Sequence, residues 1–564
     1  MAELLSARAA RAPEAPAFRF LIDGGEEGPR LSYADLDRGA RAVAAALQDV
    51  AGPGDRALLL FSPGLSFLPA FFGCQYAGVV PVPLPPPSRA DRSAAGWQSL
   101  AAIAADCEPR AILTDRTVAR FLPGGGIPAL AGVPGIVTDD LDPGGGRRWR
   151  PPAGDPDGLA LLQYTSGSTA SPKGVMVTHR NLLHNQATIR AAFGHAGDTV
   201  GVCWLPAYHD MGLIGGLLQT VYLGASTALM SPAAVLRDPS RWLRAVSRYR
   251  AHTSGGPNFV YDFCARRVTP EQKAGLDLSN WGVAAVGSEP IDPRTLDRFA
   301  RAFRSCGFRP EAFYPCYGLA EATLLVTGGA KDAAPVVRAG ITRPDGGEPR
   351  PLPEEIERPL VGCGHAQGGQ TVWIVDPESR ARLPDGRVGE IWVRGPSVAN
   401  GYWNRPAETE ETFRARLASG DGPYLRTGDL GFIREGELFV TGRIKEVIIV
   451  RGRNHYPQDI EATIQAVHPG LRPGYGAAFE VVRDGQPRLV VVQEVDRPCP
   501  KLDVARLNGV VRQTVAERHE LQVYDLVLLE YGCISKTTSG KIRRHAYRAA
   551  YEEGTLRRWE DRTL

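Results

Sequence analysis

The sequence lacks the features that mark nucleic-acid-binding, zinc-binding or disulfide-stabilised proteins. Its 65 lysine and arginine residues exceed its 62 aspartate and glutamate residues by only three. No run of basic residues is present, so a nucleic-acid partner is not indicated. The nine cysteines form no CxxC pair and their number is odd, which is typical of neither a zinc site nor a disulfide framework. This composition fits a small-molecule enzyme that keeps its thiols reduced.

Long hydrophobic runs are also missing. The longest apolar region, residues 57–87, is interrupted by Ser62-Pro63-Gly64 and ends in a proline cluster, so it cannot form one membrane-spanning helix. The N-terminal segment MAELLSARAARAPEAPAF has no apolar core of signal-peptide length. No internal repeat or heptad array is present either. We therefore expect a cytoplasmic protein without stable membrane insertion.

The 564 residues are too many for a single hydrophobic core and predict at least two domains. Short β-rich runs such as 57–61 alternate with helix-like segments such as 33–47, which indicates an α/β fold of mostly parallel sheets flanked by helices. We expect a large N-terminal domain, residues 1–443, that includes a small β subdomain. Residues 444–564 have strands and an amphipathic helix of their own, and about 120 residues suffice for a small, mobile α/β domain.

One loop is unusually rich in groups that bind phosphate. Residues 164–174 read Tyr-Thr-Ser-Gly-Ser-Thr-Ala-Ser-Pro-Lys-Gly, and hydroxyls, main-chain N–H groups and a cation together can hold a polyphosphate. A Walker A loop is excluded, because that pattern needs Gly-Lys-Ser/Thr at the start of a helix, whereas Pro172 precedes Lys173 and Gly174 follows it. Taken alone, the segment is equally consistent with a mobile surface loop. The loop directly follows the apolar run 159–162 and precedes the helix-like segment 181–192, so we expect a phosphate site at the end of a parallel strand.

Two segments further along combine titratable and aromatic side chains. Segment 204–212, WLPAYHDMG, places His209 next to a carboxylate, although a lone histidine is more often structural than catalytic. Segment 314–321, YPCYGLAE, offers aromatic rings for a base and a carboxylate, Glu321, that can hold Mg²⁺. Alone it reads as a turn that enters a helix.

Two more segments near the C-terminal end carry charged residues in glycine-containing turns. Segment 424–431, YLRTGDLG, holds Asp429, which is either an ordinary turn former or an acceptor for the two hydroxyls of a ribose. Segment 537–544, TTSGKIRR, places Lys541 on a loop close to the end of the chain. A solvated basic tail is the usual explanation of such a pattern.

These five motifs, in this order, resemble the adenylate-forming superfamily of acyl and aryl CoA synthetases, nonribosomal adenylation domains and luciferases. The resemblance runs from about Ser32 to Arg544, nearly the whole chain. Within that superfamily, the wording of 162–169, 204–213, 256–259 and 451–461 is similar to the fatty acyl-AMP ligases.

The resemblance implies how the chain would hold its nucleotide, ATP with Mg²⁺. Glu321 would bind the metal, Asp429 would accept hydrogen bonds from the ribose, and Arg443 would support Asp429. The residues implied for the β and γ phosphates are Thr165, Ser166, Gly167, Ser168, Thr169 and Lys173. Those implied for the adenine are Gly287, Ser288, Glu289, Tyr317, Gly318, Leu319 and Ala320. The superfamily usually has glycine at the position of Ala170. Alanine is tolerated there if the φ of this residue is negative.

The resemblance also implies the catalytic and acyl-binding groups. Lys541 would reach from the small domain to the carboxylate and the α-phosphate, and His209 would lie near the carboxylate or the entering pantetheine. Lys445 would be the hinge of the small domain. The expected walls of the apolar acyl tunnel, which core packing explains equally well, are Met211, Gly212, Leu213, Ile214, Asn258 and Phe259.

The function implied is that of a fatty acyl-AMP ligase, which makes acyl-AMP and passes the acyl group to the phosphopantetheine thiol of an acyl carrier protein. Tyr317 and Gly362 lie 45 positions apart, and the excess at 330–359 corresponds to the insertion that distinguishes these ligases. In the resembled family this insertion is thought to restrain the small domain and to hinder turnover with CoA. A long-chain acyl-CoA synthetase and a catalytically silent lipid or nucleotide sensor remain the alternatives.

Overall fold

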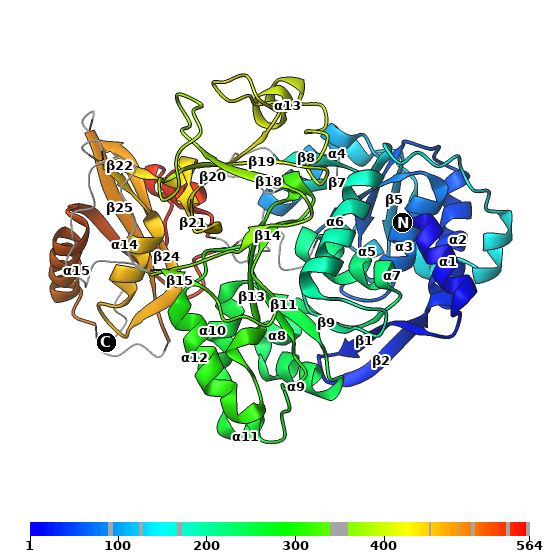
Figure 1. The fold of residues 1–564 in the computed structure, drawn as a ribbon, viewed down its shortest axis with the longest axis horizontal. Helices are drawn as coiled ribbons and strands as arrows, with labels where there is room; N and C mark the ends of the chain where they lie inside the picture. The colour runs from blue at the N-terminus through cyan, green and yellow to red at the C-terminus, as the bar shows by residue number, and fades with distance from the viewer. Residues whose placement is uncertain are drawn as a thin grey trace. The chain divides into compact units, whose positions relative to one another are not determined.

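The computed structural model describes residues 1–87, 94–122, 128–165, 172–338, 359–450, 453–483, 486–497, 502–536 and 542–559. Its residues group into two compact units (Figure 1). The first unit comprises Met1–Val336, Gly362–Trp373 and Trp392–Thr427, and the second comprises Val337–Val361, Ile374–Ile391 and Gly428–Leu564. The domain boundary expected after Arg443 stays a prediction.

The first unit is built on a nine-stranded sheet in which the inner strand pairs are parallel, as expected for an α/β fold. Strands that run antiparallel to their neighbours occupy both edges. In sheet order the strands are β17 (His365–Ala366), β14 (Leu325–Gly328), β13 (Phe313–Gly318), β12 (Val283–Val286), β11 (Thr253–Gly256), β9 (Val200–Cys203), β10 (Ser226–Met230), β1 (Pro16–Ile22) and β2 (Glu26–Ser32).

A second, all-parallel sheet contains the apolar region 57–87, which forms a strand, a helix and another strand rather than one long helix. Its order is β4 (Val80–Leu84), β3 (Arg56–Leu60), β5 (Ala111–Thr114) and β6 (Gly135–Val137). The intervening helix, α3 (Phe67–Ala77), packs against α2 (Tyr33–Gln48). A Cβ at Gly73 would lie 2.4 Å from Cγ1 of Val43, so only glycine permits this close approach.

Local sequence signals explain where the helices begin. Ser32 and Asp35 form a reciprocal capping box at the start of α2, and Thr178 and Asn181 form another at the start of α6 (His179–Phe193). The other α-helices of the first unit are α1 (Ala2–Arg11), α4 (Ala94–Cys107), α5 (Arg116–Ala119), α7 (Gln219–Leu223), α8 (Pro232–Arg237), α9 (Ser240–Arg248), α10 (Asn258–Arg267), α11 (Pro270–Lys273), α12 (Pro293–Phe303) and α13 (Pro406–Phe413).

Two further small sheets contain the strands that adjoin the predicted motifs. The hairpin of β7 (Leu159–Thr165) and β8 (Lys173–Thr178) is antiparallel. A four-stranded sheet has the order β18 (Thr371–Val375), β19 (Gly389–Arg394), β20 (Leu425–Arg434) and β21 (Glu437–Arg443). It corresponds to the small β subdomain expected from the sequence.

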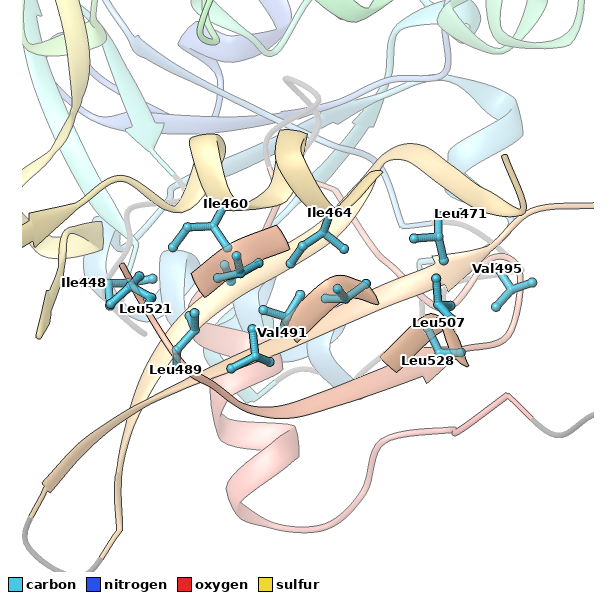
Figure 2. Close-up of a cluster of buried hydrophobic side chains, with 14 of the residues drawn as sticks. Ile448, Ile460, Ile464, Leu471, Leu489, Val491, Val495, Leu507, Leu521 and Leu528 are labelled. Carbon is cyan, nitrogen blue, oxygen red and sulfur yellow. The ribbon is translucent and has the colours of Figure 1, made fainter. Parts of the chain in front are cut away.

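The second unit has an apolar core between helices and a three-stranded sheet (Figure 2). Ile460 and Ile464 point from one helix toward the strand that carries Leu489 and Val491, and all four side chains are buried. After residue 444, the strands and α-helices of this unit are β22 (Ile448–Val450), β23 (Arg453–His455), α14 (Pro457–Gln465), β24 (Leu471–Arg483), β25 (Gln486–Val495), α15 (Val504–His519), β26 (Val523–Leu529) and α16 (Arg544–Glu552). The strands and the amphipathic helix predicted after residue 444 are therefore confirmed.

The predicted insertion at 330–359 is described only at its two ends. There β15 (Val337–Arg338) pairs with β16 (Leu360–Val361), and Val337 lies opposite Val361. Arg338 also forms an ion pair with Glu435 at 2.5 Å. The remainder of the insertion, 339–358, lies outside the described residues.

None of the helices in the described ranges has the length and apolar character needed to span a bilayer. Cys74, Cys107, Cys203 and Cys264 are buried free thiols, and burial raises the pKa of Cys203 to about 11. These four cysteines therefore match the expected buried, reduced thiols.

Candidate functional site

The strands before and after the predicted phosphate loop, β7 and β8, pair with each other in antiparallel fashion. Thr165 at the end of β7 lies directly opposite Lys173 at the start of β8. Next to this pair, a Cβ at Gly174 would come within 2.8 Å of the Tyr164 ring, so the tight packing there requires glycine. The expected phosphate ligands Ser166, Gly167, Ser168 and Thr169 lie outside the described residues.

Lys173 is held between an aromatic ring and a carboxylate that lie more than 200 positions later in the sequence. Its ammonium nitrogen lies 4.8 Å from the centroid of the Tyr402 ring, a cation–π distance. On another side it forms an ion pair with Glu408. The lysine side chain is 21% exposed, so it is partly shielded from solvent.

The same tyrosine connects Lys173 to the predicted metal ligand. The Tyr402 hydroxyl donates to Oε1 of Glu321 at 2.9 Å. The main chain of Glu321 is fixed as well, because its carbonyl oxygen accepts from the N–H of Ala399 at 2.9 Å. Lys173, Tyr402 and Glu321 therefore form one connected group in the first unit.

The predicted adenine-binding segments lie at the ends of neighbouring strands. Gly287, Ser288 and Glu289 follow β12, whereas Tyr317 and Gly318 end β13, and β12 and β13 pair in parallel. A Cβ at Gly287 would lie 3.1 Å from the carbonyl oxygen of Cys316.

The turn after β13 also depends on glycine. A Cβ at Gly318 would lie only 1.7 Å from the carbonyl oxygen of Leu324, so no other residue fits. Leu319 and Ala320, the other predicted adenine contacts, follow directly and are buried. This turn leads into the short helix Ala320–Ala322, which carries Glu321.

The expected acyl-tunnel residues adjoin the expected adenine segment. The Ser288 hydroxyl donates to Sδ of Met211 at 2.6 Å, and the Phe259 N–H donates to Oε1 of Glu289 at 2.6 Å. Asn258 accepts from the N–H of Asp292 at 3.1 Å. Leu213 and Ile214 are fully buried, as core packing alone would also require, so the tunnel stays a prediction.

A π-helix, Met211–Leu218, carries the first part of this predicted wall. It begins beside His209, whose Nδ1 lies 2.8 Å from Oδ1 of Asp210. A Cβ at Gly212 would lie 2.1 Å from the carbonyl oxygen of Pro206, which explains the glycine in this motif. The His209 side chain is 21% exposed, and its Nδ1 accepts from the N–H of Met211 at 3.3 Å.

The predicted ribose-binding pair lies in the second unit, where the two residues meet across a strand pair. Asp429 on β20 is opposite Arg443 on β21, and Oδ1 of Asp429 lies 2.7 Å from Nε of Arg443. The Gly428 N–H before Asp429 donates to Glu390 at 3.1 Å. Lys445, the predicted hinge, follows in the short helix Ile444–Glu446.

The predicted catalytic residue Lys541 lies outside the described residues. The described residues on either side of 537–541, Lys536 and Ile542, form an antiparallel bridge. Arg544 follows directly and is paired with two carboxylates, Glu446 and Glu461.

Comparison with known proteins identifies the family. Residues 5–403 match the family described as AMP-binding enzyme, which is more than half of the chain. The protein belongs to the AMP-binding, adenylate-forming enzymes. Residues 445–560 match a second family, described as the AMP domain of Disco-interacting protein 2-like proteins.

Similar proteins place this adenylate-forming enzyme among the fatty acyl-AMP ligases. It is 46% identical to a medium-chain-fatty-acid–[acyl-carrier-protein] ligase of Moorena producens over 97% of this chain and 94% of that protein. It is 38% identical to a long-chain-fatty-acid–AMP ligase of Mycolicibacterium smegmatis, over 96% and 92% of the two chains.

A solved structure with the same architecture is the fatty acid AMP ligase of Legionella pneumophila. It has a TM-score of 0.76 and 39% identity, and covers 100% of this chain and 98% of its own. A fatty acyl-adenylate ligase from a study of the Escherichia coli and L. pneumophila enzymes has a TM-score of 0.86, 31% identity and 98% coverage of both chains.

Four residues to which sequence reasoning assigned no role contact predicted site residues or their partners. Trp204 stood in a recognised motif but received no role, although it is buried, lies edge-on to Phe259 at 6.4 Å, and has an indole N–H without a hydrogen-bond partner among the described residues. Tyr402, Arg405 and Glu408 lie outside every motif that we recognised. The local signal in that segment is Pro406 at the first position of α13, which marks a helix start and carries no information about Lys173.

Proposed function

We propose that this protein activates a fatty acid with ATP and transfers the acyl group to an acyl carrier protein. The carboxylate oxygen attacks the α-phosphorus of ATP, the bond from that phosphorus to the bridging oxygen breaks, and pyrophosphate leaves. The phosphopantetheine thiol then attacks the acyl carbon of the adenylate and AMP departs. The observation that carries this proposal is the connected group of Lys173, Tyr402 and Glu321, in a chain 46% identical to a medium-chain-fatty-acid–[acyl-carrier-protein] ligase.

In this proposal the first unit supplies the groups that bind phosphate and adenine. Charge accumulates on the phosphoryl oxygens during adenylation, so preorganised cations and N–H donors are the expected source of rate. Lys173 carries such a charge at the end of the hairpin, with Thr165 opposite and 166–169 between them. Gly287 to Glu289 and Tyr317 to Ala320 would line the adenine at the ends of two adjacent strands.

The acid and the second unit have separate roles in the proposal. His209 would lie near the carboxylate or the pantetheine, and the acyl chain would pass Met211 to Ile214 and Asn258-Phe259. Asp429 and Arg443 would hold the ribose, Lys445 would act as the hinge, and Lys541 would bridge the carboxylate and the α-phosphate.

Magnesium is part of the proposal because the Glu321 carboxylate is a suitable ligand for Mg²⁺. A carboxylate oxygen is the donor that Mg²⁺ prefers, and Mg²⁺ commonly takes one protein carboxylate with the rest of its ligands from phosphates and water. Among the described residues there is no group of three or more histidine, cysteine, aspartate or glutamate side chains that could hold a metal ion. When bound, the ion would neutralise charge on the phosphates.

An assay panel tests the proposal and its alternatives. Fatty acids of increasing chain length are supplied with ATP, and acyl-AMP, acyl-CoA and acylated carrier protein are measured by mass spectrometry. We expect acyl-AMP in every productive reaction and transfer to the carrier protein but little acyl-CoA. Rapid acyl-CoA formation without carrier acylation would instead identify an acyl-CoA synthetase. ATP binding without acyl-AMP from any acid would identify a silent sensor.

Replacing Asp429 with asparagine is expected to raise the KM for ATP. A hydrogen bond to a charged group contributes about 1.5–3 kcal/mol, so the loss of the carboxylate corresponds to roughly a ten- to hundredfold increase. Steady-state pyrophosphate release as a function of ATP concentration measures it. Asp385→Asn makes the same change at an exposed position and should leave the KM unchanged. An unaltered KM in Asp429→Asn would remove Asp429 from the ribose site.

A further inference from the structure

The Lys173–Glu408 ion pair uses the ammonium group that the proposed function assigns to phosphate. Glu408 lies in the first turn of α13, and its carboxylate contacts Lys173 directly. Arg405, just before that helix, lies 3.5 Å from the other carboxylate oxygen of Glu408. One carboxylate therefore lies between two cations.

Glu408 is held close to Lys173 by the backbone rather than by the ion pair alone. The chain before α13 pairs with β8: the Met176 N–H donates to the carbonyl of Gly401 at 2.9 Å, and the Trp403 N–H donates to that of Gly174 at 2.7 Å. In addition, the Thr409 hydroxyl accepts from the N–H of Tyr402 at 2.9 Å. The start of α13 is therefore fixed relative to Lys173, and no rearrangement is needed to bring the carboxylate to the lysine.

The two partners of Lys173, the Tyr402 ring and the Glu408 carboxylate, differ in how easily they can be displaced. The Tyr402 ring is 7% exposed, packs edge-on against Phe413 at 5.0 Å and is tied to Glu321, so it is a fixed platform. The Glu408 side chain is 35% exposed and has rotatable bonds that allow it to swing away. A partly exposed ion pair of this kind is weak, and a phosphate group with more charge can replace it.

We propose that Glu408 is an internal anion that competes with the diphosphate group for Lys173. The Glu408 carboxylate pairs with the Lys173 ammonium group before the nucleotide binds, and the phosphates then displace it. The ion pair forms again when pyrophosphate leaves. This inference rests on the proposed function, because it needs the phosphates to bind at Lys173. Its consequence is weaker retention of the product, so that Glu408 favours pyrophosphate release.

A competing explanation, in which Glu408 orients Lys173, predicts the opposite change in the Kd of pyrophosphate when Glu408 is replaced. If Glu408 only orients Lys173 for the phosphates, its removal should weaken binding of the diphosphate. If it competes, its removal should strengthen binding, because Lys173 no longer has to give up a partner. The measurement is the Kd of pyrophosphate, determined by calorimetry on the full-length protein without ATP or fatty acid.

In Glu408→Gln we expect the Kd of pyrophosphate to fall about two- to fivefold, the range that corresponds to a partly exposed ion pair. Glu411→Gln makes the same charge change at an exposed position of the same helix and should alter the Kd less. Pyrophosphate should also become a stronger product inhibitor of acyl-AMP formation in Glu408→Gln. A Kd that is unchanged or raised in Glu408→Gln overturns the proposal.

A double-mutant cycle shows whether the effect passes through Lys173. In a Lys173→Met background, the additional change Glu408→Gln should leave the Kd of pyrophosphate unaltered. An equal tightening in both backgrounds would mean that Glu408 acts on the anion directly and would overturn the competition for Lys173. Formation of acyl-AMP by the wild-type protein is scored separately, so a failure of the proposed function is distinguishable from a failure of this inference.

Discussion

Replacing Lys541 with alanine is expected to abolish pyrophosphate exchange that depends on a fatty acid. The proposed role of Lys541 is to hold the carboxylate and the α-phosphate together while negative charge develops on the phosphoryl oxygens. Removing one preorganised group of this kind lowers kcat by about 10²- to 10³-fold. Radiolabelled pyrophosphate incorporated into ATP, with and without fatty acid, measures the loss.

Two other lysines make the assignment specific. Lys536 lies five positions earlier, with its ammonium 4.2 Å from the Tyr475 ring, and Lys536→Ala should keep most of the exchange activity. Lys173→Ala should mainly raise the KM for ATP and pyrophosphate, because this lysine is proposed to bind the leaving group. Full exchange in Lys541→Ala would show that another residue performs the bridging role.

Replacing Arg544 with methionine is expected to destabilise the second unit by about 3–5 kcal/mol, the cost of removing one partner from a buried ion pair. Arg544 donates to both oxygens of Glu461, at 2.7 and 2.8 Å, and to Glu446 at 2.7 Å. Its side chain is only 14% exposed. Burial by itself would lower the pKa of Arg544, but Glu461 and Glu446 outweigh burial and raise it.

The methionine variant leaves two carboxylates facing each other without their cation. Glu461 is itself 5% exposed and also accepts from the N–H of Ala478 at 2.9 Å, so the loss reaches α14 and β24. Because a chain of two units need not unfold in one step, hydrogen exchange of peptides from 445–559 is the suitable measurement. The rate of hydrogen exchange should rise in the peptides from 445–559 and not in peptides from the first unit.

Arg548→Met is the matched control for this prediction. Arg548 lies on the same helix, α16, is 46% exposed and pairs with Glu552 one turn away, so its loss should change stability by no more than about 0.5 kcal/mol. Adding Glu461→Leu and Glu446→Gln to Arg544→Met should recover part of the stability, because the uncompensated charges are then removed. Equal exchange rates in Arg544→Met and Arg548→Met would contradict the prediction.

Much of the fold follows from local sequence signals. The capping residues Ser32 and Thr178 mark the helix starts, and the alternation of apolar strands with amphipathic helices predicts parallel sheets. Such signals act over a few residues, so they can be read from the sequence without knowledge of how distant segments pack. The motifs likewise named the family, because their order along the chain is a property of the sequence alone.

The sequence did not predict the strand pairing beside the phosphate loop. The loop follows an apolar strand and precedes a helix, which suggested a site at the end of a parallel sheet. In the structure, β8 intervenes and pairs antiparallel with β7. The pattern of apolar residues in a short strand does not specify its partner or direction, so this feature depends on tertiary packing.

The sequence by itself determined the family and the α/β architecture. It also supplied the residues that we propose for the site: the hydroxyl-rich loop with Lys173, Glu321, and Asp429 with Arg443. Only the tertiary structure revealed that Tyr402 and Glu408 contact Lys173. These residues lie 229 and 235 positions after the lysine. They meet it because the backbone around Gly401 pairs with β8. Contacts of this range depend on how separate segments pack, which no local propensity or motif spacing encodes.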